Sequence, residues 1–200
     1  MRIGRHTLLL VMMAGAAALT GCGIFDTRNP EPPTQVSSSY VPPTDPSIVF
    51  QNMVSAFHDL NTVNYVRSFS DTSGGGASFR FEPSAQSGAK YAAVFAAWNR
   101  QSEQQYFEAM KSQLLSGGVM TLQFTSLTAQ RVSADSAQYE ATYSLVVPHA
   151  VTGVATTASG RAQFWLAPDQ ARLWSITSWV DLAQNPDDFT WSDFKGIFGQ

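Results

Sequence analysis

The chain has 200 residues, the size of one ordinary domain with terminal segments, and carries 12 basic against 15 acidic residues for a formal charge of −3. This acidic balance leaves no basic face to neutralise phosphates, so the composition argues against nucleic-acid binding. The single cysteine excludes an internal disulfide framework.

Residues 1–21 have the layout of a signal peptide. Arg2 and Arg5 form a basic start, residues 8–19 are apolar, and small residues occupy positions 20 and 21. A permanent membrane span needs about 20 apolar residues, so this run is too short to be one. We therefore expect the segment to be removed on export.

Cys22 stands at the predicted cleavage site. It follows Leu19-Thr20-Gly21, and this order resembles the bacterial lipobox, which implies that the Cys22 thiol is acylated and anchors the protein to a membrane. The alternative is an ordinary free thiol behind a conventional signal, but an exported free thiol is a reactive liability. Gly23 replaces the aspartate that usually retains Gram-negative lipoproteins in the inner membrane. The resemblance thus implies a lipid-anchored cell-envelope protein, at the outer membrane and facing the periplasm in a Gram-negative cell.

Residues 22–44 have the composition of a linker. They include five prolines and a serine run, and such a segment buries too little apolar surface to offset the entropy of ordering. We predict three segments: a signal peptide at 1–21, an anchor and linker at 22–44, and a single domain at 45–200.

The domain is predicted to begin with two helices. Asp45 before Pro46 is a favourable N-cap, and an apolar stripe follows at helical spacing through Leu60. Asn61 is predicted to cap a shorter helix that carries Val63, Val66 and Phe69.

The middle of the domain is predicted to be a glycine turn, a short strand, a loop and a long helix. Phe79 and Phe81 alternate with polar residues before Pro83, which is typical of a strand. After a small-residue loop, Ser102 and Gln105 form a capping-box pattern, and the helix is expected to run to Gly117.

Beyond residue 119 the apolar period changes from 3.6 to 2. Four alternating stretches follow, joined by connections too short for crossover helices, which predicts an antiparallel meander. The fold class is therefore α+β, with N-terminal helices packed on a curved antiparallel sheet. An apolar tail, residues 187–200, is predicted to form a short helix begun by Thr190 or Ser192, packed on the domain or on a second copy.

The order of these elements resembles the nuclear-transport-factor-like cone, also called SnoaL-type or cystatin-like. The resemblance covers about residues 45–182 and rests on that order, on Trp174-Ser175-Ile176 and Trp179-Val180-Asp181 in the last strand, and on the stretch 65–69. The start of the mature chain and residues 191–195 are similar to bacterial lipoproteins of this build. That second likeness implies no activity.

A cone of this family implies a pocket between sheet and helices. The predicted lining residues are aromatic: Phe57, Tyr65, Phe81, Trp98, Phe107, Tyr143, Phe164, Trp174 and Trp179. The alternative is that these side chains fill the core, since packing alone explains aromatic residues at period 2.

Enzymes of this family, such as ketosteroid isomerase and the polyketide cyclases, set an aspartate against a tyrosine or acid inside the cone. By type and position, the candidates here are Asp59, Tyr65 and Asp181, with His58 beside Asp59. Ordinary roles at a helix end and a strand end are the alternative for the two aspartates.

No cofactor or metal is predicted. The sequence beyond the leader has two histidines and lacks the zinc-binding and hydrolase motifs. The preferred hypothesis is a non-catalytic lipoprotein that binds a small apolar molecule, a protein or a second copy of itself. The alternative is a small isomerase or cyclase that uses an Asp/Tyr pair.

Overall fold

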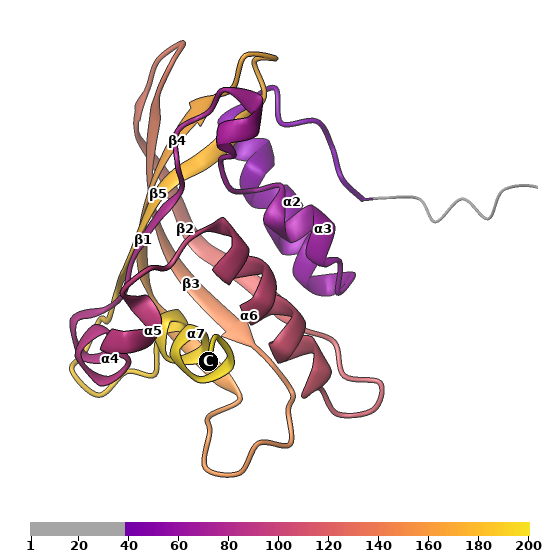
Figure 1. The fold of residues 1–200 in the computed structure, drawn as a ribbon, viewed down its shortest axis with the longest axis vertical. Helices are drawn as coiled ribbons and strands as arrows, with labels where there is room; N and C mark the ends of the chain where they lie inside the picture. Colours follow the sequence, from indigo (N-terminus) through magenta and orange to yellow (C-terminus); the bar gives the residue numbers. More distant parts are fainter. Residues whose placement is uncertain (1–38) are drawn as a thin grey trace, which may run out of the picture. The chain divides into compact units, whose positions relative to one another are not determined.

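The computed structural model describes residues 39–200 (Figure 1). The predicted signal peptide, Cys22 and most of the predicted linker lie outside these residues. Helices gather on one face of a five-stranded sheet, and the apolar core lies between the two layers. The architecture is the predicted α+β cone.

The two predicted N-terminal helices are present. Helix α2 spans Pro46–His58, and its cap Asp45 accepts a hydrogen bond from the Ser47 backbone N–H at 2.8 Å. Helix α3 spans Thr62–Val66, and Asn61 caps it. Both caps act within a few residues, which is why the sequence alone could place them.

The end of the predicted linker contacts the domain. The Val41 backbone exchanges hydrogen bonds with the Asn52 side chain at 2.9 and 2.7 Å, and the Pro43 carbonyl accepts one from the Trp174 backbone N–H at 2.8 Å. Residues 41–43 thus join α2 to the last strand.

Two short helices precede the long helix, the first in the stretch predicted as a small-residue loop and the second in residues 91–98, where a helical extension was the alternative. After the 3₁₀ turn Thr72–Gly74 and strand β1 (Arg80–Glu82), the chain forms α4 (Ala85–Lys90) and α5 (Ala92–Phe95). Alanine-rich sequence forms helix readily, and its lack of an apolar stripe concealed this from a periodicity argument.

Helix α6 begins earlier and ends earlier than predicted, at Arg100–Ser112. Asn99 is the cap, because its side chain accepts from two following backbone N–H groups while the Ser102 hydroxyl accepts from the Asn99 N–H. Ser102 is therefore the third helical residue rather than the cap. Leu114, predicted as helical, instead pairs with His149 in an isolated bridge.

The four predicted antiparallel strands form a meander. They are β2 (Thr121–Val132), β3 (Ala137–Val146), β4 (Thr157–Pro168) and β5 (Trp174–Leu182), and the sheet order is β1-β5-β4-β3-β2. Strand β1 runs parallel to β5 and places Phe81 opposite Trp179. The sequence did not predict that parallel pairing.

The tail forms helix α7 (Trp191–Phe198), with Thr190 as its cap and Asp193 completing a capping box. Of the two predicted starts, Thr190 is the cap, and Ser192 lies inside the helix. Helix α7 lies over the sheet between α6 and the α4–α5 segment (Figure 1). Of the helices within residues 39–200, none has the length and hydrophobicity to cross a bilayer.

Candidate functional site

Helix α7 occupies the interior of the cone. Trp191, Phe194 and Lys195 have no exposed surface, although they come from the last ten residues of the chain. The Trp191 ring packs at 4.5 Å from Trp179 and at 5.4 Å from Phe57, so one residue of α7 contacts both the sheet and α2. The space between the sheet and α2 is therefore filled by the chain itself.

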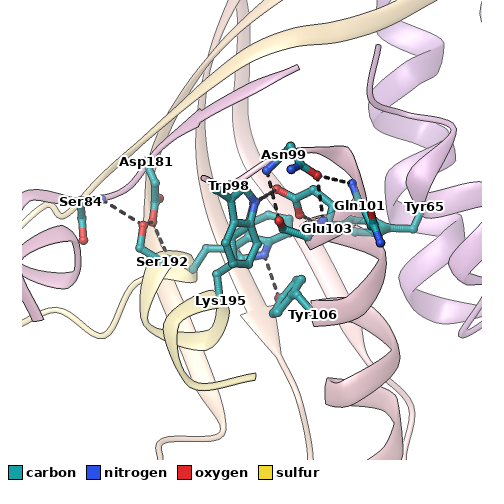
Figure 2. Close-up of polar contacts among 12 residues, drawn as sticks. Tyr65, Ser84, Trp98, Asn99, Gln101, Glu103, Tyr106, Asp181, Ser192 and Lys195 are labelled. Atoms are coloured by element: carbon teal, nitrogen blue, oxygen red, sulfur yellow. Dashed lines mark hydrogen bonds and ion pairs between the residues drawn. The ribbon is translucent and has the colours of Figure 1, made fainter. Parts of the chain in front are cut away.

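A buried ion pair joins α7 to α6. The Lys195 ammonium donates to Glu103 Oε1, and both side chains have no exposed surface (Figure 2). Glu103 also accepts from the Trp98 indole N–H at 2.7 Å and from the Tyr65 hydroxyl at 2.7 Å. Three donors from three parts of the chain therefore converge on this carboxylate.

Aromatic rings surround the Lys195 ammonium. Its nitrogen lies 3.7 Å from the ring centroids of both Phe81 and Trp179, and 5.5 and 5.9 Å from those of Trp98 and Tyr106. Burial lowers the pKa of Lys195 to about 8, and the charge and hydrogen bond of Glu103 oppose that shift. The amine remains mostly protonated at neutral pH.

A second buried network centres on Asp181. Its Oδ1 accepts from the Tyr143 hydroxyl at 2.6 Å, and its Oδ2 accepts from the backbone N–H and hydroxyl of Ser192 at 2.8 and 2.5 Å. The Trp191 backbone N–H donates to the Tyr143 oxygen at 2.9 Å. Burial raises the pKa of Asp181, whereas the bonds from Ser192 and Tyr143 lower it. The first turn of α7 thus engages both members of this acid–tyrosine pair.

Helix α7 also makes a hydrogen bond from the Trp191 indole N–H to the Tyr106 hydroxyl at 3.0 Å. Of the buried side-chain N and O atoms in the described part of the chain, Ser68 Oγ, Ser70 Oγ and Trp179 Nε1 lack a hydrogen-bond partner. Neither buried carboxylate is among them.

The structure separates the three catalytic candidates. Asp59 lies at the surface, where it contacts Ser39 and, at 3.0 Å, the exposed His58 ring, so it is not in the cone. Tyr65 is buried but bonds Glu103. Asp181 is buried beside a tyrosine, which is Tyr143 rather than Tyr65. Asp59 was misplaced because it caps the exposed end of α2, which turns away from the core.

The nine predicted pocket residues lie in a packed core. Eight are buried and Phe81 is half-buried. All but Trp174 have ring contacts at about 4 to 6 Å, and Phe57, Tyr143 and Trp179 contact Trp191 of α7. Of the nine, Trp174 also lines a surface cleft.

Glu103 and Lys195 are the residues that sequence reasoning missed. Each interrupts an apolar helical stripe: Glu103 precedes Tyr106, Phe107 and Met110, and Lys195 lies between Trp191 and Phe198. A charge within a buried stripe requires a partner. A negative charge in one apolar stripe and a positive charge in another could therefore have predicted a buried ion pair between the two helices.

Two of the surface clefts on residues 39–200 are larger than the others described. One, of about 610 Å³, lies between α2 and β2 and is mostly apolar, with Phe50, Val54, Leu122, Phe124 and Leu127 in its lining. The other, of about 400 Å³, is lined by residues that include Tyr40, Arg67, Arg100, Asp169 and Trp174. Within residues 39–200 there is no cluster of three His, Cys, Asp or Glu residues that could hold a metal.

Comparison with solved structures identifies the fold. The chain is similar to a proposed dehydratase of the NTF2-like family from Streptomyces avermitilis, with 9% identity, a TM-score of 0.51, and coverage of 70% of this chain and 93% of that one. An NTF2-like protein of unknown function in nutrient uptake from Rhodospirillum rubrum has 10% identity and a TM-score of 0.50, with coverage of 70% of this chain and 99% of that one. A proposed aromatic ring hydroxylase from Novosphingobium aromaticivorans has 12% identity and a TM-score of 0.51, with coverage of 70% of this chain and 87% of that one.

No family model matches the chain, and no curated protein sequence matches it. At these identities, the structural likeness establishes the NTF2-like cone fold and leaves the activity open.

Proposed function

We propose that this chain is a membrane-anchored bacterial lipoprotein whose cone serves as a non-catalytic binding domain in the cell envelope. The anchor rests on the lipobox-like Leu19-Thr20-Gly21-Cys22 and the leader before it. Acylation at Cys22 would supply the two or more acyl chains that stable membrane attachment requires.

One observation carries the non-catalytic part of this proposal. The buried carboxylates of the cone, Glu103 and Asp181, already accept hydrogen bonds from α7, and Trp191 and Lys195 fill the space beside them. A general base must reach the proton that it removes, either directly or through one water. With α7 in place, a substrate has no position from which to offer that proton.

Binding in this account takes place on the outside of the domain. The apolar cleft between α2 and β2 suits a small apolar molecule, because apolar walls with a few polar groups are typical of ligand sites. A protein partner or a second copy would also reach this face, because β2 is an edge strand of the sheet.

The anchor is tested by replacing Cys22 with serine in the full chain and fractionating the cells. We expect the wild-type protein in the membrane fraction with the mass of an acylated N-terminal cysteine, and the variant in the soluble fraction without acyl mass. A variant that still partitions with membranes would contradict the anchor.

Binding is tested separately by native mass spectrometry of residues 39–200 purified from the original host. This segment retains the Val41 and Pro43 contacts that a start at residue 45 would remove. We expect a retained small molecule, a protein partner or a dimer. An empty monomer would contradict the binding role.

The alternative of a small isomerase or cyclase is favoured by the 2.6 Å contact between Tyr143 and Asp181 in a buried setting. It requires α7 to leave, because Ser192 occupies Oδ2 of that carboxylate. Under the enzyme hypothesis, Asp181→Asn should abolish isomerase or cyclase activity while the protein remains folded. Under the binding hypothesis, the same substitution should mainly lower the free energy of unfolding.

A further inference from the structure

The surroundings of the Lys195 ammonium have the composition of a recognition site for organic cations. A cation over aromatic faces is attracted by their quadrupoles, and the attraction grows when water is excluded. Phe81 and Trp179 meet the ammonium at 3.7 Å, and the Glu103 carboxylate supplies the opposite charge. We call Phe81, Trp98, Tyr106, Trp179 and Glu103 the ammonium cage.

The cage is built entirely by elements other than α7. Its rings come from β1, β5, the residue before the α6 cap, and α6 itself. The Glu103 carboxylate is held by the Tyr65 hydroxyl and the Trp98 indole, each at 2.7 Å. Of the groups that make this site, α7 therefore contributes the cation alone.

Helix α7 is also joined to the domain in the manner of a tethered segment. Residues 184–187, between β5 and α7, are exposed. This exposed segment links the helix to β5, the strand that carries Trp179 of the cage.

We propose that the interior of the cone is a binding site for a primary alkylammonium group, which Lys195 occupies in cis so that α7 acts as a tethered ligand. An alkylammonium ion from outside can bind in the same cage when the Lys195 ammonium is absent from it. This goes beyond the proposed function, which needs only the outer surface.

The test removes the tethered cation and supplies a free one. Lys195→Ala deletes three carbons and the ammonium nitrogen, and propylammonium contains those same atoms. Small molecules do enter buried cavities made by truncation. At about pH 7, tens of millimolar propylammonium chloride should raise the melting temperature of the full-length variant by about 3–5 °C. Propanol, and sodium chloride at matched ionic strength, should raise it by less than about 1 °C.

Two controls give the test its specificity. The wild-type protein should not respond to propylammonium, because Lys195 fills the cage, and Lys195→Met should not respond, because its uncharged chain fills the same space. An equal rise with propanol, an equal rise in Lys195→Met, or no rise in Lys195→Ala would each overturn the proposal.

If Lys195→Ala does not fold alone, the readout becomes the yield of folded protein when it is refolded with each additive. Propylammonium should then restore folding where propanol and sodium chloride do not. Equal yields with all three additives would overturn the proposal. Failure of this test leaves the Cys22 fractionation unaffected, so the two proposals can fail separately.

Discussion

Glu103 and Lys195 are charged residues without exposed surface, and their energetic role follows from that burial. Removing an ion from water is costly, and the mutual attraction of the pair offsets this cost only when the remaining donors and acceptors are satisfied. Here the carboxylate has three donors and the ammonium has aromatic faces on several sides. Loss of one partner alone should therefore cost more than replacement of both.

Glu103→Gln should destabilise the domain by about 3–5 kcal/mol, because it leaves the Lys195 ammonium buried without a counter-charge. The measurement is urea unfolding at about pH 7. Glu108→Gln is a matched control on the same helix, since Glu108 pairs with Lys111 at 3.2 Å at an exposed position and should change stability by no more than about 0.5 kcal/mol. A loss below about 1 kcal/mol in Glu103→Gln would contradict the role of the pair.

The lowered pKa of Lys195 gives stability a definite pH dependence. In the unfolded chain the pKa is 10.5, and in the folded chain burial lowers it to about 8. Between these values the unfolded state binds more protons, so the free energy of unfolding rises with pH across the window. Below pH 8 the folded state bears the full cost of keeping the buried amine protonated.

From about pH 7.5 to pH 9.5, the free energy of unfolding should rise by about 2 kcal/mol relative to the double variant Glu103→Gln/Lys195→Met, which lacks the titrating amine. The measurements end at about pH 9.5 because burial also raises the pKa values of Tyr65, Tyr106 and Tyr143 well above 10. At higher pH these tyrosines ionise in the unfolded state alone, which lowers the free energy of unfolding. Equal slopes in the two proteins would show that Lys195 titrates normally.

At this scale, the sequence predicts what is decided by near neighbours. The caps Asp45 and Asn61 and the helix start at Thr190 each depend on a few adjacent residues. The Glu103–Lys195 pair joins positions 92 residues apart. No local sequence pattern indicates that these two buried charges form an ion pair with each other. Asp181 was selected by residue type, but its tyrosine partner required the register of β3, β4 and β5.

At the scale of elements, α7 is held by close approach as well as by polar contacts. Gly196 faces Tyr91, and a Cβ atom at position 196 would lie 2.2 Å from Cδ2 of that ring. The side chain at 91 therefore rests directly on the backbone of α7. Glycine at this helical position is explained by packing against the α4–α5 segment.

Gly196→Ala should destabilise the domain by about 1–3 kcal/mol through overpacking, although alanine is the better helix former by about 1 kcal/mol. Thermal unfolding measures this loss. In a Tyr91→Ala background the clash is absent, so the same substitution should become neutral or stabilising. A stabilising effect in the wild-type background would contradict the close packing of α7.

The elements that sequence reasoning missed share a physical cause. Helix α4 has alanine, glycine and serine where an amphipathic pattern would show apolar residues, and α5 has only four residues, too few for a helical period. Strand β1 has only three residues, and its parallel pairing with β5 depends on a partner nearly one hundred residues away. The meander was predictable because its strands pair with sequence neighbours through short turns.

At the scale of the whole molecule, the C-terminal helix α7 fills the space between the sheet and the other helices. The sheet and helices have the NTF2-like cone arrangement. This chain adds two buried acid–tyrosine pairs, and the side chains of α7 are part of the apolar core. The clefts on the outer surface and the proposed lipid anchor then determine which ligands or partners the domain can bind.

Helix α7 covers the interior of the cone with the Lys195 ammonium inside, and amine labelling of the folded protein measures this burial. The chain has three lysines: Lys90 is exposed, Lys111 is partly exposed, and Lys195 is buried. If Lys195, with its pKa of about 8, were accessible, it would react faster than the other two lysines, because more of its amine would be unprotonated. If Lys195 is buried, it should react more slowly than both. We predict that limited acetylation, read by peptide mass spectrometry, labels Lys90 and Lys111 at least about tenfold faster than Lys195, and that urea removes the difference. Labelling of Lys195 at the rate of Lys90 or faster in the folded protein would contradict the account.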